Sequence, residues 1–245
     1  MTVFPIRLQT HAWNPLGGRR ALLLHGLSAD GGTMWRTASF LAGHGWTAIA
    51  PDLRSHGRSP TADDHRLDAF VADIGLLGDS WDLIVAHSFG GTIAAELLAG
   101  DLVAPAVLID PLLTLDRAGA EWLRPRLHAK CGTLEAEQLQ RDNPSWSPRD
   151  VHRRVLAAAQ MTPDVVDAII DDNVPLAVAN RSAAWSAPVV VLAVDRQDGG
   201  AVTPDDVAVL QRRSSIVVIE AGTGHSVHCE RPELVVEAIR QVVTI

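Results

Sequence analysis

Short, wholly apolar runs alternate with amphipathic segments along most of the chain, and this pattern predicts strands alternating with helices. The apolar runs lack the in-and-out alternation of a half-exposed sheet, which is typical of parallel strands covered on both faces. Strands are expected at 20–24, 46–50, 83–86, 104–109, 188–194 and 215–220, with one or two edge strands within 3–13. Helices are expected at 33–44, 67–77, 92–100, 204–213 and 232–243. The fold class predicted is therefore α/β, with a mainly parallel sheet between two layers of helices.

The stretch 112–187 departs from this alternation. It shows no convincing strand, and its amphipathic segments, broken by prolines, lie at 117–130, 134–141, 148–159 and 163–172. It also contains Trp122, Trp146 and Trp185, three of the seven tryptophans. We interpret it as a helical insertion in the sheet domain; a set of ordinary peripheral helices is the alternative.

A serine stands at the apex of one strand–turn–helix unit. The apolar run 83–86 is followed at once by His87-Ser88-Phe89-Gly90-Gly91 and then by a predicted helix. This resembles the nucleophile elbow of the α/β-hydrolases, in which small flanking residues let a strained turn expose the serine oxygen. The first small position is Ala86 here, where the family pattern has glycine. A buried serine at an ordinary turn is the alternative.

The resemblance extends to the order of the other catalytic residues. In this family a serine, an acid and a histidine follow one another along the chain, each after a strand. Ser88, Asp195 and His225 match that order, and His225 lies in a Gly-x-Gly-His loop after the last strand. Asp195 directly follows the strand 188–194 and is the preferred acid, ahead of Asp198 and then Asp110.

The same resemblance implies an oxyanion hole. In the family, a His-Gly pair after the early strand opens a loop whose next backbone N–H binds the developing oxyanion. His25 and Gly26 form that pair, so Leu27 is expected to donate, together with Phe89 after the serine. The His25 side chain is expected to pack or to hydrogen-bond its own loop.

Other polar residues are interpreted as structural. Asp52, Arg54 and Arg58 belong to a loop that resembles a family loop of architectural role, and His56 and His65 are expected at the surface. His228 and Cys229 lack further ligands at metal-binding spacing. We therefore expect no metal and no organic cofactor.

Composition limits partners and location. The formal net charge of −8 disfavours nucleic acid and anionic membranes as partners. Only two cysteines occur, which favours a reducing cytoplasm. No signal peptide is recognised, and no apolar run approaches the roughly 20 residues needed to span a bilayer.

Together these features predict an α/β-hydrolase with an eight-stranded type of sheet, a core at 1–111 and 188–245, and a helical cap at 112–187. The expected reaction is cleavage of an ester or similar acyl bond in a small, fairly apolar substrate through an acyl-enzyme. A carbon–carbon hydrolase is an alternative, and would use cap arginines to bind a carboxylate. The candidates for that role are Arg124, Arg126, Arg154 and Arg181. A ligand receptor that retains the fold is a further alternative, with perhydrolase activity ranked low, while the substrate and the oligomeric state stay open.

Overall fold

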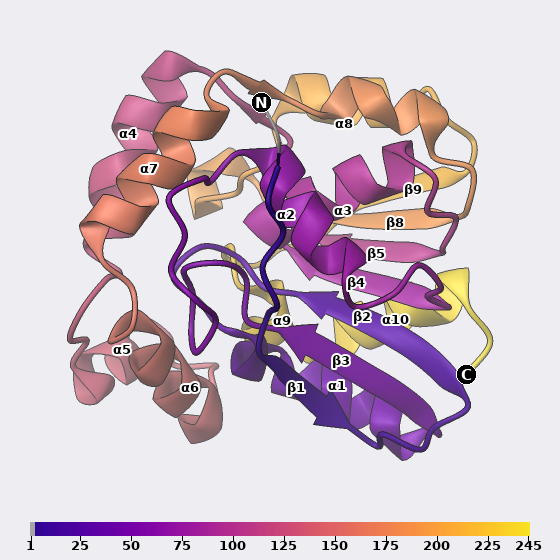
Figure 1. Cartoon of the computed structure of the whole chain (residues 1–245), viewed down its shortest axis with the longest axis horizontal. Coiled ribbons are helices and arrows are strands. Elements are labelled where there is room, and N and C mark those ends of the chain that lie inside the picture. Colours follow the sequence, from indigo (N-terminus) through magenta and orange to yellow (C-terminus); the bar gives the residue numbers. More distant parts are fainter. Residues whose placement is uncertain (1–2) are drawn as a thin grey trace.

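A seven-stranded sheet forms the centre of the protein in a computed structural model that describes residues 3–245 (Figure 1). Its order is β1-β3-β2-β4-β5-β8-β9. Only β1 is antiparallel to its neighbour; the other pairs are parallel. The strands are β1 (Thr10–Trp13), β2 (Arg19–Leu24), β3 (Trp46–Pro51), β4 (Leu83–His87), β5 (Ala106–Ile109), β8 (Val189–Ala193) and β9 (Ile216–Glu220).

Helices cover both faces of this sheet because its strands bury successive side chains on opposite sides. Leu22, Ile84 and Leu108 face one layer, whereas Leu23 and Val85 face the other. The first layer contains α2 (Leu67–Gly75), α3 (Phe89–Ala99) and α8 (Pro204–Leu210). The second contains α1 (Trp35–Gly43), which follows the short helix η1 (Gly31–Met34), and α10 (Pro232–Val242), which follows α9 (Val227–Glu230). The predicted α/β class is confirmed.

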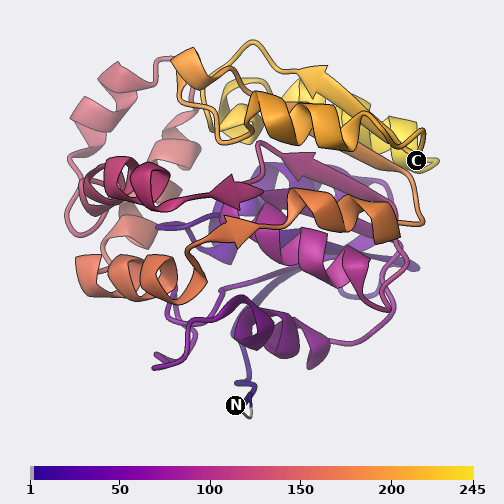
Figure 2. The ribbon, with the colours of Figure 1, turned by 90° about the horizontal axis from the view of Figure 1, so that it is seen from above.

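The inserted helices form a group of their own at the side to which the parallel strands point (Figures 1 and 2). They are α4 (Arg117–His128), α5 (Ala136–Asp142), α6 (Pro148–Ala158) and α7 (Pro163–Asn173). No strand was expected here, but β6 (Thr114–Leu115) and β7 (Leu176–Ala177) pair antiparallel where the chain leaves and rejoins the core. The following η2 (Ala179–Ala184) packs on α3 and α8, and Trp185 donates its indole N–H to the carbonyl of Ala95.

The N-terminal segment accounts for the difference between the eight-stranded type of sheet expected and the seven strands observed. Residues 3–9 form no strand: two of their N–H groups donate to side chains, and the Gln9 carbonyl accepts from Asp52 N–H just beyond β3. Ile6 N–H donates to Asp73 Oδ1 at 2.6 Å, and Gln9 N–H donates to Ser59 Oγ at 2.9 Å. Only β1 therefore joins the sheet from this end of the chain.

Two histidines expected at the surface are buried, so that prediction is wrong. His56 and His65 are 2% and 3% exposed. His56 Nδ1 donates to the carbonyl of Arg54, and His65 Nε2 lies 2.9 Å from Ser55 Oγ. Burial lowers the pKa of His56 to about 3, so its imidazole is neutral.

The loop after β3 is held by a buried ion pair. Arg54 Nε and Nη2 each donate to one oxygen of the Asp73 carboxylate at 2.7 Å, and both side chains are 1% exposed. Arg54 Nη1 also donates a hydrogen bond to the carbonyl oxygen of Asp64. The expected architectural role of Arg54 therefore rests on a fork geometry that only arginine provides.

Arg54→Met is expected to lower the free energy of unfolding by about 3–5 kcal/mol, because it leaves the Asp73 carboxylate buried without its partner. Urea unfolding followed by circular dichroism measures the change. Arg66→Gln is the control, since Arg66 pairs with Asp64 and Asp68 at the surface and is expected to cost less than about 1 kcal/mol. Equal losses in the two variants would contradict the prediction.

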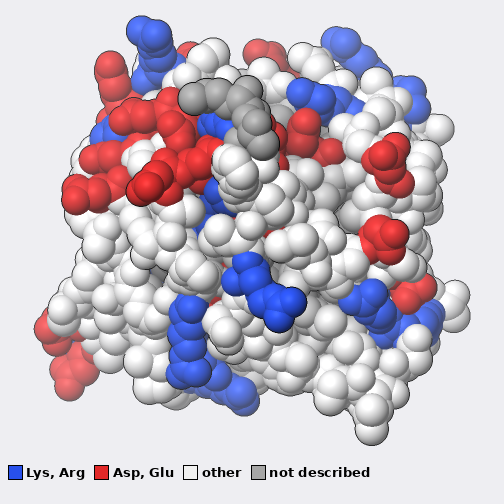
Figure 3. Space-filling model, in the orientation of Figure 1, with Lys and Arg blue, Asp and Glu red and all other residues white. Residues whose placement is uncertain are grey.

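Acidic side chains gather over the inserted helices on the face shown in Figure 3. Helix α7 alone carries Asp164, Asp167, Asp171 and Asp172. This surface agrees in sign with the net charge of −8. Within residues 3–245, no helix combines the length and the apolar character needed to cross a membrane.

Candidate active site

Ser88 occupies a strained turn between β4 and α3. Its φ of 52° and ψ of −119° lie in a region that non-glycine residues rarely adopt. The turn depends on small neighbours: a Cβ added at Gly90 would lie 2.6 Å from the carbonyl oxygens of Leu24 and His25. At Gly91 the added Cβ would lie 2.5 Å from the Cβ of Pro111. The elbow geometry expected from the sequence is therefore present, and Ser88 is partly exposed at its apex.

His225 lies beside this turn and is held by a buried carboxylate. Its Nδ1 is 2.5 Å from Oδ2 of Asp110, which is 0% exposed. The Asp110 carboxylate also accepts hydrogen bonds from the backbone N–H groups of Val194, Ala201 and Val202. Four donors thus fix this carboxylate, which fixes in turn the orientation of the imidazole.

The preferred acid of the sequence prediction takes no part in this contact. Asp195 accepts a hydrogen bond from the N–H of Gln197 and begins the short helix η3 (Arg196–Asp198), and both Asp195 and Asp198 are exposed. Asp110 stands at the end of β5 and Asp195 just beyond the end of the adjacent strand β8. The prediction that Asp195 pairs with His225 is therefore wrong. Asp110, the residue ranked third, pairs with His225 instead.

The loop of His225 packs directly on the elbow. His87 is the residue before Ser88, and its Nε2 lies 3.0 Å from the carbonyl oxygen of His225. The ring centroid of His87 lies 4.7 Å from that of His225 and 4.6 Å from that of His228. No hydrogen bond joins Ser88 Oγ to His225 within residues 3–245. No sequence pattern indicates this histidine cluster, because only the fold brings the two segments together.

Burial keeps the imidazoles of His87 and His228 neutral. It lowers the pKa of His87 well below its usual value, and the charges of His228 and His225 act in the same direction. Burial likewise lowers the pKa of His228 to about 4. Among these three imidazoles, His225 is the one that contacts a carboxylate, that of Asp110.

Two backbone amides next to Ser88 are free to bind an oxyanion. Leu27 follows Gly26, whose added Cβ would lie 2.9 Å from the Cβ of Ser88. The N–H groups of Leu27 and Phe89 donate to no acceptor in the described part of the chain. His25 donates from Nδ1 to the carbonyl of Gly26 and accepts from Leu53 N–H, which fixes this loop as expected.

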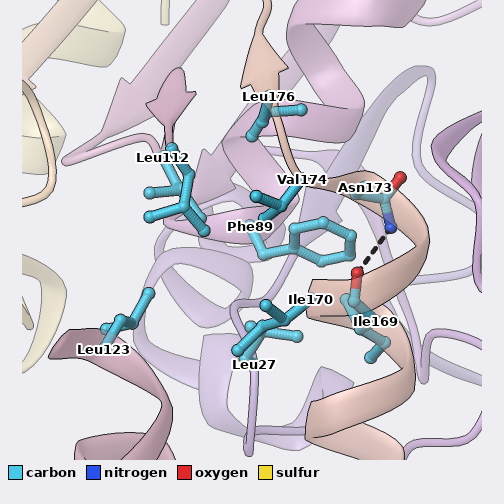
Figure 4. A pocket seen from close by; sticks show the side chains of 10 residues that line it. Leu27, Phe89, Leu112, Leu123, Ile169, Ile170, Asn173, Val174 and Leu176 are labelled. Carbon is cyan, nitrogen blue, oxygen red and sulfur yellow. Dashed lines mark hydrogen bonds between the residues drawn. The ribbon is translucent and has the colours of Figure 1, made fainter. Parts of the chain in front are cut away.

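An apolar cavity adjoins these amides, bounded by the core loops and the inserted helices (Figure 4). Its volume is about 10 Å³, which is the space of one water-sized sphere. Leu27 and Phe89 line it from the core, Leu123 from α4, and Ile169 and Ile170 from α7. Asn173, the polar residue in its wall, donates to the carbonyl of Ile169 and thereby closes the end of α7.

One cluster of metal-ligand type occurs among the described residues, at His11, Asp30 and Asp52. Asp52 Oδ1 already binds His11 Nε2 and the N–H of Gly31, while Oδ2 binds the N–H of Arg58. Burial by itself would raise the pKa of Asp52, but these hydrogen bonds outweigh it and set the pKa at about 2. The cluster therefore serves as a loop anchor, in agreement with the role expected of Asp52.

A known protein family matches most of this sequence. The model of the Alpha/beta hydrolase family matches residues 21–238, which is most of the chain. The chain belongs to the α/β hydrolase family. Lipase LipV of Mycobacterium tuberculosis is 31% identical over 194 residues, covering 76% of this chain and 69% of the lipase.

Solved structures of this family share the fold at low identity. E-2-(acetamidomethylene)succinate hydrolase superposes with a TM-score of 0.80 and 18% identity, covering 97% of this chain and 95% of its own. N-formylmaleamic acid deformylase from Pseudomonas putida S16 gives 0.74 and 20%, covering 96% of both chains. Identities this low show only that the fold is shared. The similarity to the lipase supports the conclusion that this chain is a hydrolase.

Proposed function

We propose that this protein is a serine hydrolase that cleaves an ester or a similar acyl bond of a small molecule. The observation that carries the proposal is the contact of His225 with buried Asp110 beside a strained turn that exposes Ser88. A nucleophile, a base and a group that orients the base are the parts this chemistry requires. The likeness to a lipase supports the same reaction class.

In the proposed reaction, Ser88 Oγ attacks the substrate carbonyl carbon while His225 takes the hydroxyl proton. Asp110 holds the Nδ1–H of His225 and stabilises the imidazolium that forms. The N–H groups of Leu27 and Phe89 bind the oxyanion, a contribution worth on the order of 3 kcal/mol per donor in related chemistry. The leaving group takes the proton from His225, and water then hydrolyses the acyl-enzyme by the same steps.

We further propose that the helices α4–α7 act as the cap over this site. Leu123 of α4 and Ile169 of α7 reach the cavity next to the oxyanion amides, so the cap supplies an apolar wall. The cavity is about 10 Å³, the space of one water-sized group, so we propose that substrate binding separates α4 and α7 from the core loops. A small substrate with an apolar part suits these walls.

Covalent labelling tests the proposal without a known substrate. A fluorophosphonate reacts with an activated serine, so the intact protein is expected to gain the mass of a single phosphonyl group, located by peptide mapping on Ser88. His225→Ala is expected to slow labelling by at least about 100-fold, because Ser88 then lacks its base. Labelling at another serine, or equal rates in both proteins, would overturn the proposal.

A further inference from the structure

The four arginines considered for carboxylate binding differ in what they contact. Arg124 and Arg181 form ion pairs with carboxylates at 2.6 and 2.9 Å, and Arg126 lies over an exposed tryptophan ring. Arg154 of α6 differs from them, because its Nη1 donates to the backbone carbonyl oxygen of Ser28, in the loop between β2 and η1. That loop also contains one of the two amides proposed to bind the oxyanion.

Few hydrogen bonds hold the part of this loop that carries the Leu27 amide. On one side, His25 Nδ1 donates at 2.8 Å to the Gly26 carbonyl, which is the opposite end of the planar peptide that carries the Leu27 N–H. On the other side, the bond from Arg154 is the one hydrogen bond formed by any backbone group of residues 27–29 in the described part of the chain. The hydrogen bonds that position the Leu27 N–H are therefore these two.

The backbone of Ser28 requires such support. Its φ of 57° lies in the left-handed region that residues other than glycine rarely adopt, and the residue is 1% exposed. A residue keeps a conformation of this kind only where its surroundings hold it. Arg154 supplies a charge-assisted hydrogen bond to the carbonyl of this residue. The side chain of Ser28 is held as well, since its Oγ lies 4.0 Å from Sγ of Cys131, beyond the end of α4.

Helix α6 is fixed to the core without the help of Arg154. The Asp150 carboxylate in its first turn accepts from Arg36 Nη2 at 2.6 Å and from the indole N–H of Trp35 at 2.8 Å. Arg36 and Trp35 both belong to α1, and Asp150 is buried. Arg154 therefore extends toward the loop from a helix that is already anchored, and its replacement is expected to leave α6 in place.

We propose that Arg154 is a positioning residue of the oxyanion hole: its bond to the Ser28 carbonyl keeps the Leu27 N–H directed at the oxyanion that forms beside Ser88. This inference rests on the proposed serine hydrolase function. The inserted helices then contribute to the stabilisation of the transition state, in addition to the apolar wall of the cavity. A contribution of this kind lowers the barrier of the chemical step and has little effect on the binding of the uncharged substrate.

Arg154→Met is expected to lower kcat for p-nitrophenyl hexanoate by about 10- to 100-fold and to leave KM within about threefold of the wild type. Loss of a whole oxyanion donor costs roughly 100- to 1000-fold, and a displaced donor costs less. Arg154→Lys keeps a cationic donor and is expected to lose less activity than Arg154→Met. Arg149→Met is the matched control and should stay within about twofold, because Arg149 is an exposed arginine of the same helix whose guanidinium lies over Trp35.

A pair of ketones separates positioning of the amide from a general loosening of the site. Ser88 Oγ adds to the carbonyl carbon of 1,1,1-trifluoro-2-octanone, the hydroxyl proton moves to His225, and the carbonyl oxygen becomes an oxyanion. 2-Octanone has the same chain length and binds without forming a stable adduct. In Arg154→Met, the inhibition constant of the trifluoromethyl ketone is expected to rise by about tenfold or more, and that of 2-octanone to stay within about twofold. Equal changes for the two ketones would overturn the inference.

The Leu27 amide can also be observed directly, without any turnover. A Gly–Leu pair occurs twice in the sequence, at Gly26–Leu27 and at Gly75–Leu76. Protein labelled with ¹³C-carbonyl glycine and ¹⁵N-leucine therefore gives two amide signals in an HNCO spectrum, and Leu76→Val identifies the second. Leu76 lies at the exposed end of α2, so its signal serves as a reference and shows that each variant is folded. Arg154→Met is expected to shift or broaden the Leu27 signal and to leave the Leu76 signal unchanged.

The spectrum and the kinetics together distinguish failure of this inference from failure of the proposed function. If no ester is turned over by the wild type and the Leu27 signal still changes in Arg154→Met and not in Arg149→Met, the proposed function fails and the positioning of the amide by Arg154 stands. If esters are turned over, and neither kcat nor the Leu27 signal changes in Arg154→Met, the positioning role fails alone.

Discussion

Ser88→Ala is expected to lower kcat for a medium-chain p-nitrophenyl ester by at least about a thousandfold, with the folded state unchanged. The loss follows because no other side chain at the elbow can form the acyl-enzyme, and removal of a catalytic serine costs up to about a millionfold in well-studied hydrolases. Alanine occupies the same backbone region as serine, with the same strain at φ 52°. Steady-state kinetics without added metal measures the change.

Ser226→Ala is the matched control for this variant. Ser226 lies next to His225, and its side chain forms no hydrogen bond at the start of α9. Activity within about threefold of the wild type is expected. Retained activity in Ser88→Ala would remove Ser88 from the chemistry, and equal losses in both variants would point to general disturbance of the His225 loop.

Asp110→Asn is expected to lower kcat by roughly a thousandfold to ten-thousandfold, while Asp195→Asn changes it by less than about threefold. An asparagine at 110 presents a neutral amide to His225 Nδ1, so the imidazole loses the partner that selects its tautomer and stabilises its charged form. Asp195 is exposed and bonds its own short helix, so its removal leaves His225 untouched. The two variants change the same functional group after two adjacent strands.

Stability is checked alongside, because Asp110 also accepts from three backbone N–H groups. Thermal unfolding followed by circular dichroism defines the temperature at which each variant is folded, and kinetics are compared there. Fluorophosphonate labelling of Ser88 should slow in Asp110→Asn and not in Asp195→Asn. A large loss in Asp195→Asn with a small one in Asp110→Asn would reverse the assignment of the acid.

Much of the candidate site could be predicted from local sequence. The elbow around Ser88 depends on small residues within a few positions, and the loop of His225 depends on its flanking glycines. Both patterns can therefore be recognised in the sequence alone. The alternation of strands and helices is equally local, because each strand is a continuous apolar run buried on both faces. The two-residue strands β6 and β7 were missed because pairing over such a length leaves no periodic signal.

The acid could not be chosen in this way. Asp110 and Asp195 follow the neighbouring parallel strands β5 and β8, so both lie at the same edge of the sheet. Asp110 has a φ of 40° and turns toward His225, whereas Asp195 turns back to Gln197. Side-chain direction at a strand end depends on the backbone of the next few residues and on the loop that packs there. The distance in sequence between the aspartate and the apolar run therefore does not predict the direction of its side chain.

The sequence by itself determined the fold class and singled out Ser88 and His225, the proposed nucleophile and base, because short-range patterns of apolar and small residues specify strands, helices and the elbow. Only the tertiary structure decided which carboxylate holds His225, that His56 and His65 are buried, and that Arg154 of α6 donates to the carbonyl of Ser28. These are contacts between segments far apart in the chain. The packing of loops against one another sets them, and no local pattern encodes that packing.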